Sequence, residues 1–268
     1  TIQNGGFGFS GGGGLANAGL INNDGTINNY SDLVLVGGGS LLNNSGATLN
    51  NAGTIISAYG TSLANAGTFT NAGAITINNG GFVGNSASMS VSATGTITIY
   101  GGFGNLANSG TLTNDGAITS FGGMIQNAGI LNNTGSISSS GQLTNYAPGL
   151  ATAAGGTINN AGTIGNSGLL TNAGTLNTFL GGSLNNLAGG TIDNSGTLGN
   201  GGTLTNDGLI NNSGVLDTYL GSVLNNNVGG TINNTGAMFT DFTGVVNNAG
   251  TMNNGFNGGT SAMFTNTG

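Results

Sequence analysis

Residues 192–215 read IDNSGT, LGNGGT, LTNDGL and INNSGV, which are four consecutive six-residue repeats. Each repeat begins with an aliphatic residue, has Asn in third place and Gly in fifth place, and often ends in Thr. The same repeat starts at Leu15, Leu63, Leu106 and Ile125. This much Gly and Asn excludes helix. Each repeat is therefore predicted to form a three-residue strand followed by a tight bend.

Strand alternation predicts a role for each place in the repeat. The aliphatic residue points inward, the next residue points outward, and Asn points inward or into the corner. The Asn amide is expected to bond to the Asn one coil above or below, which would build an amide ladder. Gly is expected to supply a positive φ at the corner. Thr is β-branched and suits the exposed side of a strand.

Longer, eight-residue repeats predict wider corners, and several aromatic residues precede Gly-rich bends there. Their positions are separated by close to multiples of 20, which predicts coils of about 20 residues built from six- and eight-residue repeats. The fold class predicted is all-β, a parallel β-helix or β-solenoid. We expect residues 1–268 to form a single array that is irregular around 80–105 and has no evident terminal caps. The predicted aromatic row is Tyr59, Tyr100, Phe121, Phe179, Tyr219 and Phe239.

The string from Gly156 to Ile164, GTINNAGTI, resembles passenger regions of filamentous-haemagglutinin-type adhesins and autotransporters. The resemblance implies a right-handed β-helix, an extracellular or bacterial surface location, and a role in surface fibres or adhesion. Left-handed hexapeptide-repeat solenoids are the alternative. In those proteins Gly directly follows the aliphatic residue, whereas here it comes four residues later.

The composition excludes several classes of function. The charged residues are seven Asp, and the chain has no Lys, Arg, His, Glu, Cys or Trp. Without cations it has no footprint for nucleic acid or for anionic membranes, and no apolar run is long enough for membrane insertion. No Asp pair has the one-coil spacing that would stack two carboxylates for glycoside hydrolysis. We therefore predict no enzyme activity, no catalytic residues, no cofactor and no metal site.

Two surface features suggest ligands. The aromatic row could stack on sugars of a glycan or host surface, or form a seam with a neighbouring solenoid, or simply pack the wide corners. The outward Thr residues could bind ice if they formed a flat array. Thr157 and Thr163, however, lie six residues apart and so fall on different faces, which scatters the array.

The two ends of the sequence continue the repeat frame, because placing a second copy after the first joins FTNTGT to IQNGGF. Head-to-tail polymers of identical chains are therefore expected, since open coils expose unpaired strand edges. A stretch cut from a longer repeat protein would give the same continuity. The predicted stacking residues are Thr1, Ile2, Asn4, Phe264, Asn266 and Gly268.

Overall fold

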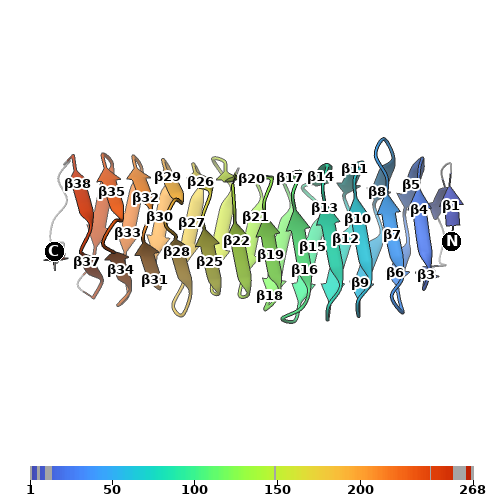
Figure 1. Ribbon diagram of the computed structural model, residues 1–268, viewed down its shortest axis with the longest axis horizontal. Coiled ribbons are helices and arrows are strands. Elements are labelled where there is room, and N and C mark those ends of the chain that lie inside the picture. Colours follow the sequence, from blue (N-terminus) through green and yellow to red (C-terminus); the bar gives the residue numbers. More distant parts are fainter. Residues whose placement is uncertain are drawn as a thin grey trace. The chain divides into compact units, whose positions relative to one another are not determined.

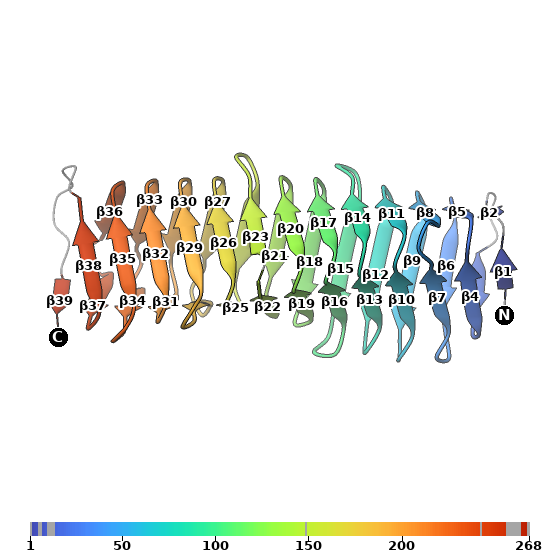
Figure 2. The same cartoon turned by 45° about the horizontal axis from the view of Figure 1, so that its top comes forward.

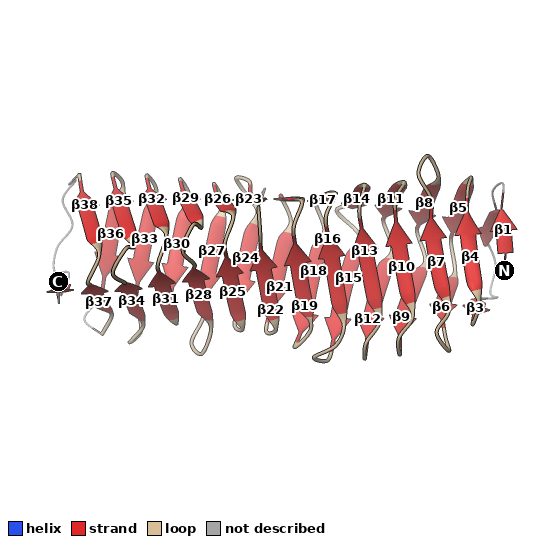
Figure 3. Cartoon of the chain, viewed as in Figure 1, coloured by secondary structure: helices blue, strands red, loops and turns tan. Residues whose placement is uncertain are grey.

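The computed structural model describes residues 2–4, 7–9, 14–147, 149–241, 243–255 and 264–266. All regular elements in these residues are β-strands, and none of the described residues is helical (Figure 3). The chain divides into two units, Thr1–Ser136 and Ile137–Gly268, here called unit 1 and unit 2. Each unit is by itself a β-solenoid in which every coil gives one strand to each of three parallel sheets, A, B and C.

Unit 1 runs from blue to green in Figure 1. Its sheet A comprises β1 (Ile2–Asn4), β4 (Leu20–Asn23), β7 (Ser40–Asn43), β10 (Ser62–Asn65), β13 (Phe82–Asn85), β16 (Asn105–Asn108) and β19 (Met124–Asn127). Sheet B comprises β2 (Phe7–Phe9), β5 (Thr26–Asn29), β8 (Thr48–Asn51), β11 (Thr68–Asn71), β14 (Ser88–Val91), β17 (Thr111–Asn114) and β20 (Ile130–Asn133). Sheet C comprises β3 (Leu15–Asn17), β6 (Asp32–Leu35), β9 (Thr54–Ala58), β12 (Ala74–Asn78), β15 (Thr96–Tyr100) and β18 (Ala117–Phe121).

Unit 2 has the same three-sheet organisation (Figure 2). Its sheet A comprises β22 (Gln142–Asn145), β25 (Thr163–Asn166), β28 (Ser183–Asn186), β31 (Thr203–Asn206), β34 (Val223–Asn226), β37 (Val245–Asn248) and β39 (Phe264–Asn266). Sheet B comprises β23 (Gly149–Thr152), β26 (Leu169–Asn172), β29 (Thr191–Asn194), β32 (Leu209–Asn212), β35 (Thr231–Asn234) and β38 (Thr251–Asn254). Sheet C comprises β21 (Ser136–Ser139), β24 (Thr157–Asn160), β27 (Thr175–Thr178), β30 (Thr197–Asn200), β33 (Val215–Thr218) and β36 (Ala237–Thr240).

Equivalent residues of neighbouring coils pair in register about 20 residues apart. Leu63, for example, is aligned with Leu41 of one neighbouring coil and with Val83 of the other. The predicted fold class, an all-β solenoid with coils of about 20 residues, is thereby confirmed. Residues 80–105 contribute the paired strands β13, β14 and β15, and the irregular residues lie partly in the turns and partly in the strands, where Val91 and Ile99 replace the usual Asn. The right-handed sense and the single array of 1–268 stay predictions.

The interior of each unit is a set of stacked aliphatic columns. Most strands show the same alternation, in which the second and fourth residues are buried and the first and third are partly exposed. The aliphatic second residues, such as Leu49 and Leu204, are fully buried. Burying one such side chain contributes roughly 1.5–3 kcal/mol before the cost of ordering the chain. The predicted inward and outward places are therefore correct, although most strands have four residues and include the preceding Thr.

An Asn ends most strands of sheets A and B, and its side chain hydrogen-bonds one coil to the next. Nδ2 of Asn43 donates to Oδ1 of Asn65 (2.6 Å) and to the carbonyl of Thr68 (3.0 Å), and Oδ1 of Asn43 accepts from Asn23 (2.7 Å). The same bonds run from Asn186 to Asn206 in unit 2. Because each amide donates to the following coil, all these bonds point in one direction along the chain. The predicted amide ladder is confirmed.

Gly in the six-residue repeats has a different role from the predicted one. Gly73 does not have a positive φ, but a Cβ at this position would lie 2.1 Å from the carbonyl oxygen of Gly53, one coil earlier. Gly196 lies equally close to the carbonyl oxygen of Gly174. The backbones of successive coils thus touch at these corners, and only Gly fits. Positive φ values occur in the longer bends instead, as at Gly122.

Candidate functional surfaces

The turns that lead from sheet C to sheet A form one edge of unit 1, and they carry three residues of the predicted aromatic row. Tyr59 follows β9, and Tyr100 and Phe121 end β15 and β18. Tyr59 is 74% exposed, has a φ of 54° and accepts a 3.4 Å hydrogen bond from Asn79. The rings of Tyr100 and Phe121 stack with centroids 5.3 Å apart and planes 16° apart. One face of each stacked ring is therefore covered, while the edge of unit 1 that these turns form is accessible as a whole.

In unit 2 the row is less regular. Phe179 and Tyr219 follow β27 and β33 in the same kind of turn, and the Tyr219 ring lies over Gly199 and Gly201 of the preceding coil. Phe239 is the third residue of β36 and is aligned with Asp217, so it belongs to the outer face of sheet C rather than to the turns. Sugar binding by the aromatic row stays a prediction.

The outer face of sheet B in unit 1 carries two columns of hydroxyl side chains. Register pairing stacks the first residues of five consecutive strands in one column and the third residues of three strands in a second column. We call these eight residues the hydroxyl grid: Thr26, Thr48, Thr68, Ser88 and Thr111 in the first column, and Thr70, Ser90 and Thr113 in the second. Asn28 and Asn50 extend the second column.

The sequence prediction that neighbouring repeats place Thr on different faces is correct, because Thr157 lies in sheet C and Thr163 in sheet A. The outward Thr residues as a whole are not scattered, however, since Thr residues about one coil apart fall on the same face. A search at the coil period rather than at six residues could have found the hydroxyl grid.

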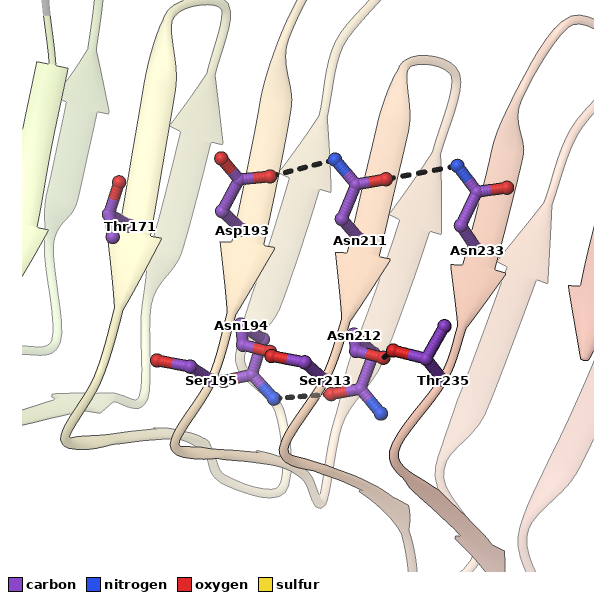
Figure 4. A pocket seen from close by; sticks show the side chains of 9 residues that line it. All are labelled: Thr171, Asp193, Asn194, Ser195, Asn211, Asn212, Ser213, Asn233 and Thr235. Atoms are coloured by element: carbon purple, nitrogen blue, oxygen red, sulfur yellow. Dashed lines mark hydrogen bonds between the residues drawn. The ribbon is translucent and has the colours of Figure 1, made fainter. Parts of the chain in front are cut away.

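The outer face of sheet B in unit 2 instead holds a groove of about 280 Å³ that is lined by Thr, Ser, Asn and Asp side chains (Figure 4). A row of side chains from β29, β32, β35 and β38 is bonded end to end: Asn253 donates to Asn233 (2.8 Å), Asn233 to Asn211 (3.0 Å) and Asn211 to Asp193 (2.8 Å). Beside it, hydroxyls such as Ser213 donate to backbone carbonyls of the preceding coil. Most of these polar groups therefore already have a partner within the protein.

Two carboxyl groups of unit 2 have shifted pKa values. Asp241 accepts hydrogen bonds from the backbone amides of Leu220 (3.0 Å), Thr243 (3.0 Å) and Gly244 (2.9 Å), which lower its pKa to about 2. Burial and then the charge of Asp241 raise the pKa of Asp217. In the described part of the chain no three His, Cys, Asp or Glu side chains gather closely enough to hold a metal ion.

The predicted stacking residues lie at the edges of what the structure describes. Ile2 and Asn4 belong to β1, which pairs with β4, and Phe264 and Asn266 belong to β39, which pairs with β37. Thr1 and Gly268 lie outside the described residues. Head-to-tail stacking stays a prediction.

Comparison with known proteins assigns no family to the chain. No family model matches the chain, and no curated protein matches it. One similar solved structure is the crystal structure of the TibC-catalysed hyper-glycosylated TibA55-350 fragment, at 18% identity and a TM-score of 0.36, with 98% of each chain covered. None of the described residues forms a helix that is long and apolar enough to cross a membrane.

Proposed function

We propose that the protein is a structural and adhesive element, the shaft or self-stacking subunit of a bacterial extracellular fibre or matrix filament. The observation that carries this proposal is the repeated hydrogen bonding between Asn side chains of successive coils at the corners. In each unit, Asn side chains and the strand ladders join every coil to the next one in the same way. Stability then depends on contacts between neighbouring coils and increases with their number, which suits a fibre.

The composition supports the same function. The chain contains neither Lys nor Arg, so trypsin-like proteases have no cleavage site in it, which favours survival outside the cell. The aromatic edge of unit 1 supports an adhesive role toward a host surface or glycan. Tyr59, Tyr100 and Phe121 are exposed there, and exposed apolar groups of this kind are typical of interaction surfaces.

Light scattering at increasing protein concentration, together with electron micrographs, tests the structural role. We expect filaments whose number increases with concentration. A chain that stays monomeric at high concentration, with no filaments in the micrographs, would contradict self-stacking.

Binding to glycan arrays and to host-cell surfaces tests the adhesive role. The double variant Tyr100→Ser, Phe121→Ser removes the stacked pair and should reduce binding. Tyr30→Ser is the matched control, because Tyr30 is equally an exposed aromatic residue of unit 1 but follows β5, on a different edge. Equal binding by both variants would exclude the aromatic edge as the adhesive surface.

A further inference from the structure

The hydroxyl grid is not needed for a fibre, and it places two columns of hydroxyls side by side on one face. None of its eight hydroxyls makes a hydrogen bond within the described part of the chain. Some stacked hydroxyls elsewhere pair with each other, as Ser62 does with Ser40 (3.2 Å) and Ser183 with Thr163 (3.2 Å), both in sheet A. Those of Thr76, Thr98 and Thr119 in sheet C, like those of the grid, have no such partner among the described residues, but they form a single column. The grid therefore offers donors and acceptors to something outside the protein.

The grid is regular in two dimensions. Stacked strands place its members about 4.8 Å apart along each column, and two residues of strand separate the columns by about 6.6 Å. Directly beneath lie Ile27, Leu49, Phe69, Met89 and Leu112, all at most 1% exposed. This packed layer holds the backbone in place, and the β-branched Thr side chains are stiff at χ1. The backbone positions of the grid are therefore fixed, and rotation of its Thr side chains is restricted.

The grid is also uncharged. The nearest acids in sequence, Asp24 and Asp115, lie in the turns that flank sheet B rather than on its face. An ion would find no opposite charge on this face. A glycan chain repeats in one dimension only and prefers aromatic faces, which the grid lacks. A ligand that is neutral, polar and periodic in two dimensions at these spacings is crystalline water.

We propose that the outer face of sheet B in unit 1 binds the surface of ice through the hydroxyl grid. The hydroxyls hydrogen-bond to lattice oxygens of ice, whose repeats are of the same size as the grid spacings. The Thr methyl groups fill the space between these oxygens. Adsorbed protein then stops local growth of the crystal face. This role is independent of the fibre function.

The chain contains a matched pair of sites that tests the proposal. The sequence TLTNDG occurs at 111–116, within the grid, and again at 203–208, in sheet A of unit 2. There Thr205 has Asn185 and Asn225 as its stacked neighbours, so it is not part of a hydroxyl column. Thr113→Tyr and Thr205→Tyr therefore make the same change in the same local sequence, but only the first disrupts the grid.

The experiment measures thermal hysteresis, the shape of growing ice crystals, and uptake of fluorescently labelled protein into an ice hemisphere. We expect the wild-type chain to be active in all three, Thr205→Tyr to retain that activity, and Thr113→Tyr to lose most of it. Circular dichroism and thermal melting verify that the variants are folded. If Thr113→Tyr does not fold, Thr68→Tyr replaces it. Absence of ice uptake by the wild-type chain, or equal activity of the two folded variants, overturns the proposal, whatever the micrographs show about filaments.

Discussion

The outer faces of sheet B in units 1 and 2 lie over equivalent interiors but differ in their chemistry. In unit 1 the face carries Thr and Ser with no partners among the described residues, whereas in unit 2 it carries a bonded row that ends at Asp193, with Leu169 and Leu209 in the other column. Beneath both faces the second residue of most strands is a buried apolar side chain, such as Met89 in unit 1 and Ile210 in unit 2, whereas Met252 in the last coil of unit 2 is only partly buried. Packing therefore constrains the residues of the interior of this solenoid, while its outward residues are free to differ.

The largest effect should come from a charge in the interior. Leu112→Asp in unit 1 and Leu204→Asp in unit 2 each bury a carboxylate in a protein without cations, and each should lower the free energy of unfolding by about 3–5 kcal/mol. The outward controls Thr111→Asp and Thr203→Asp should have little effect. Chemical denaturation followed by circular dichroism measures all four variants. Leu112 lies beneath sheet B and Leu204 beneath sheet A, so clearly different losses for the two Leu variants would show that the interior is not equally packed throughout the two units.

A smaller loss is expected at the corners between sheets B and C. Gly73→Ala in unit 1 and Gly196→Ala in unit 2 each push a methyl group against a carbonyl of the preceding coil, which should cost about 1–3 kcal/mol. Gly102→Ala and Gly165→Ala are matched controls, because a Cβ at either position meets no atom within 4 Å and neither has a positive φ. Thermal melting should separate the two pairs. Similar melting of all four variants would show that the coils can move apart at these corners.

At the buried last residue of the sheet B strands, a substitution is expected to increase the stability of the protein rather than lower it. One coil in each unit interrupts the Asn ladder, with Val91 in unit 1 and Thr152 in unit 2, and Oδ1 of Asn114 and of Asn172 consequently lacks a donor. Thr152→Asn should donate to Asn172 and stabilise unit 2 by about 1 kcal/mol. Val91→Asn should gain less, because it removes a buried apolar side chain. If denaturation midpoints show a loss for Thr152→Asn, the ladder is not the source of corner stability.

The smallest effect on stability is expected from protonation of Asp241 at low pH. The pKa of Asp241 is about 2 in the folded protein, below its ordinary value of 3.8. Its carboxylate therefore stabilises the fold above about pH 4, and this contribution is lost as the pH falls through about 2. Melting temperatures between pH 6 and pH 2 should decrease for the wild-type chain and less so for Asp241→Asn. Parallel curves would show that the bonds from Leu220, Thr243 and Gly244 add no stability.

The interior could be predicted from the sequence, because aliphatic residues and Asn recur every six residues and strand alternation assigns their directions. The role of Gly73 could not, since the carbonyl that excludes a side chain there belongs to the preceding coil. The hydroxyl grid was missed for a related reason. Stacked Asn residues lie 18 residues apart in one place and 23 in another, so columns on the surface appear only when the register of each coil is known.

Because of the Asn hydrogen bonds, one edge of a coil accepts from the preceding coil and the other edge donates to the following coil. An exposed coil edge shows unfilled amide oxygens toward one end of its unit and unfilled N–H groups toward the opposite end, as the bonds around Asn43 require. Two identical edges brought face to face would set oxygen against oxygen or N–H against N–H. This polarity disfavours contact between identical coil edges and so restricts the disordered edge-to-edge aggregation to which open β-sheets are prone.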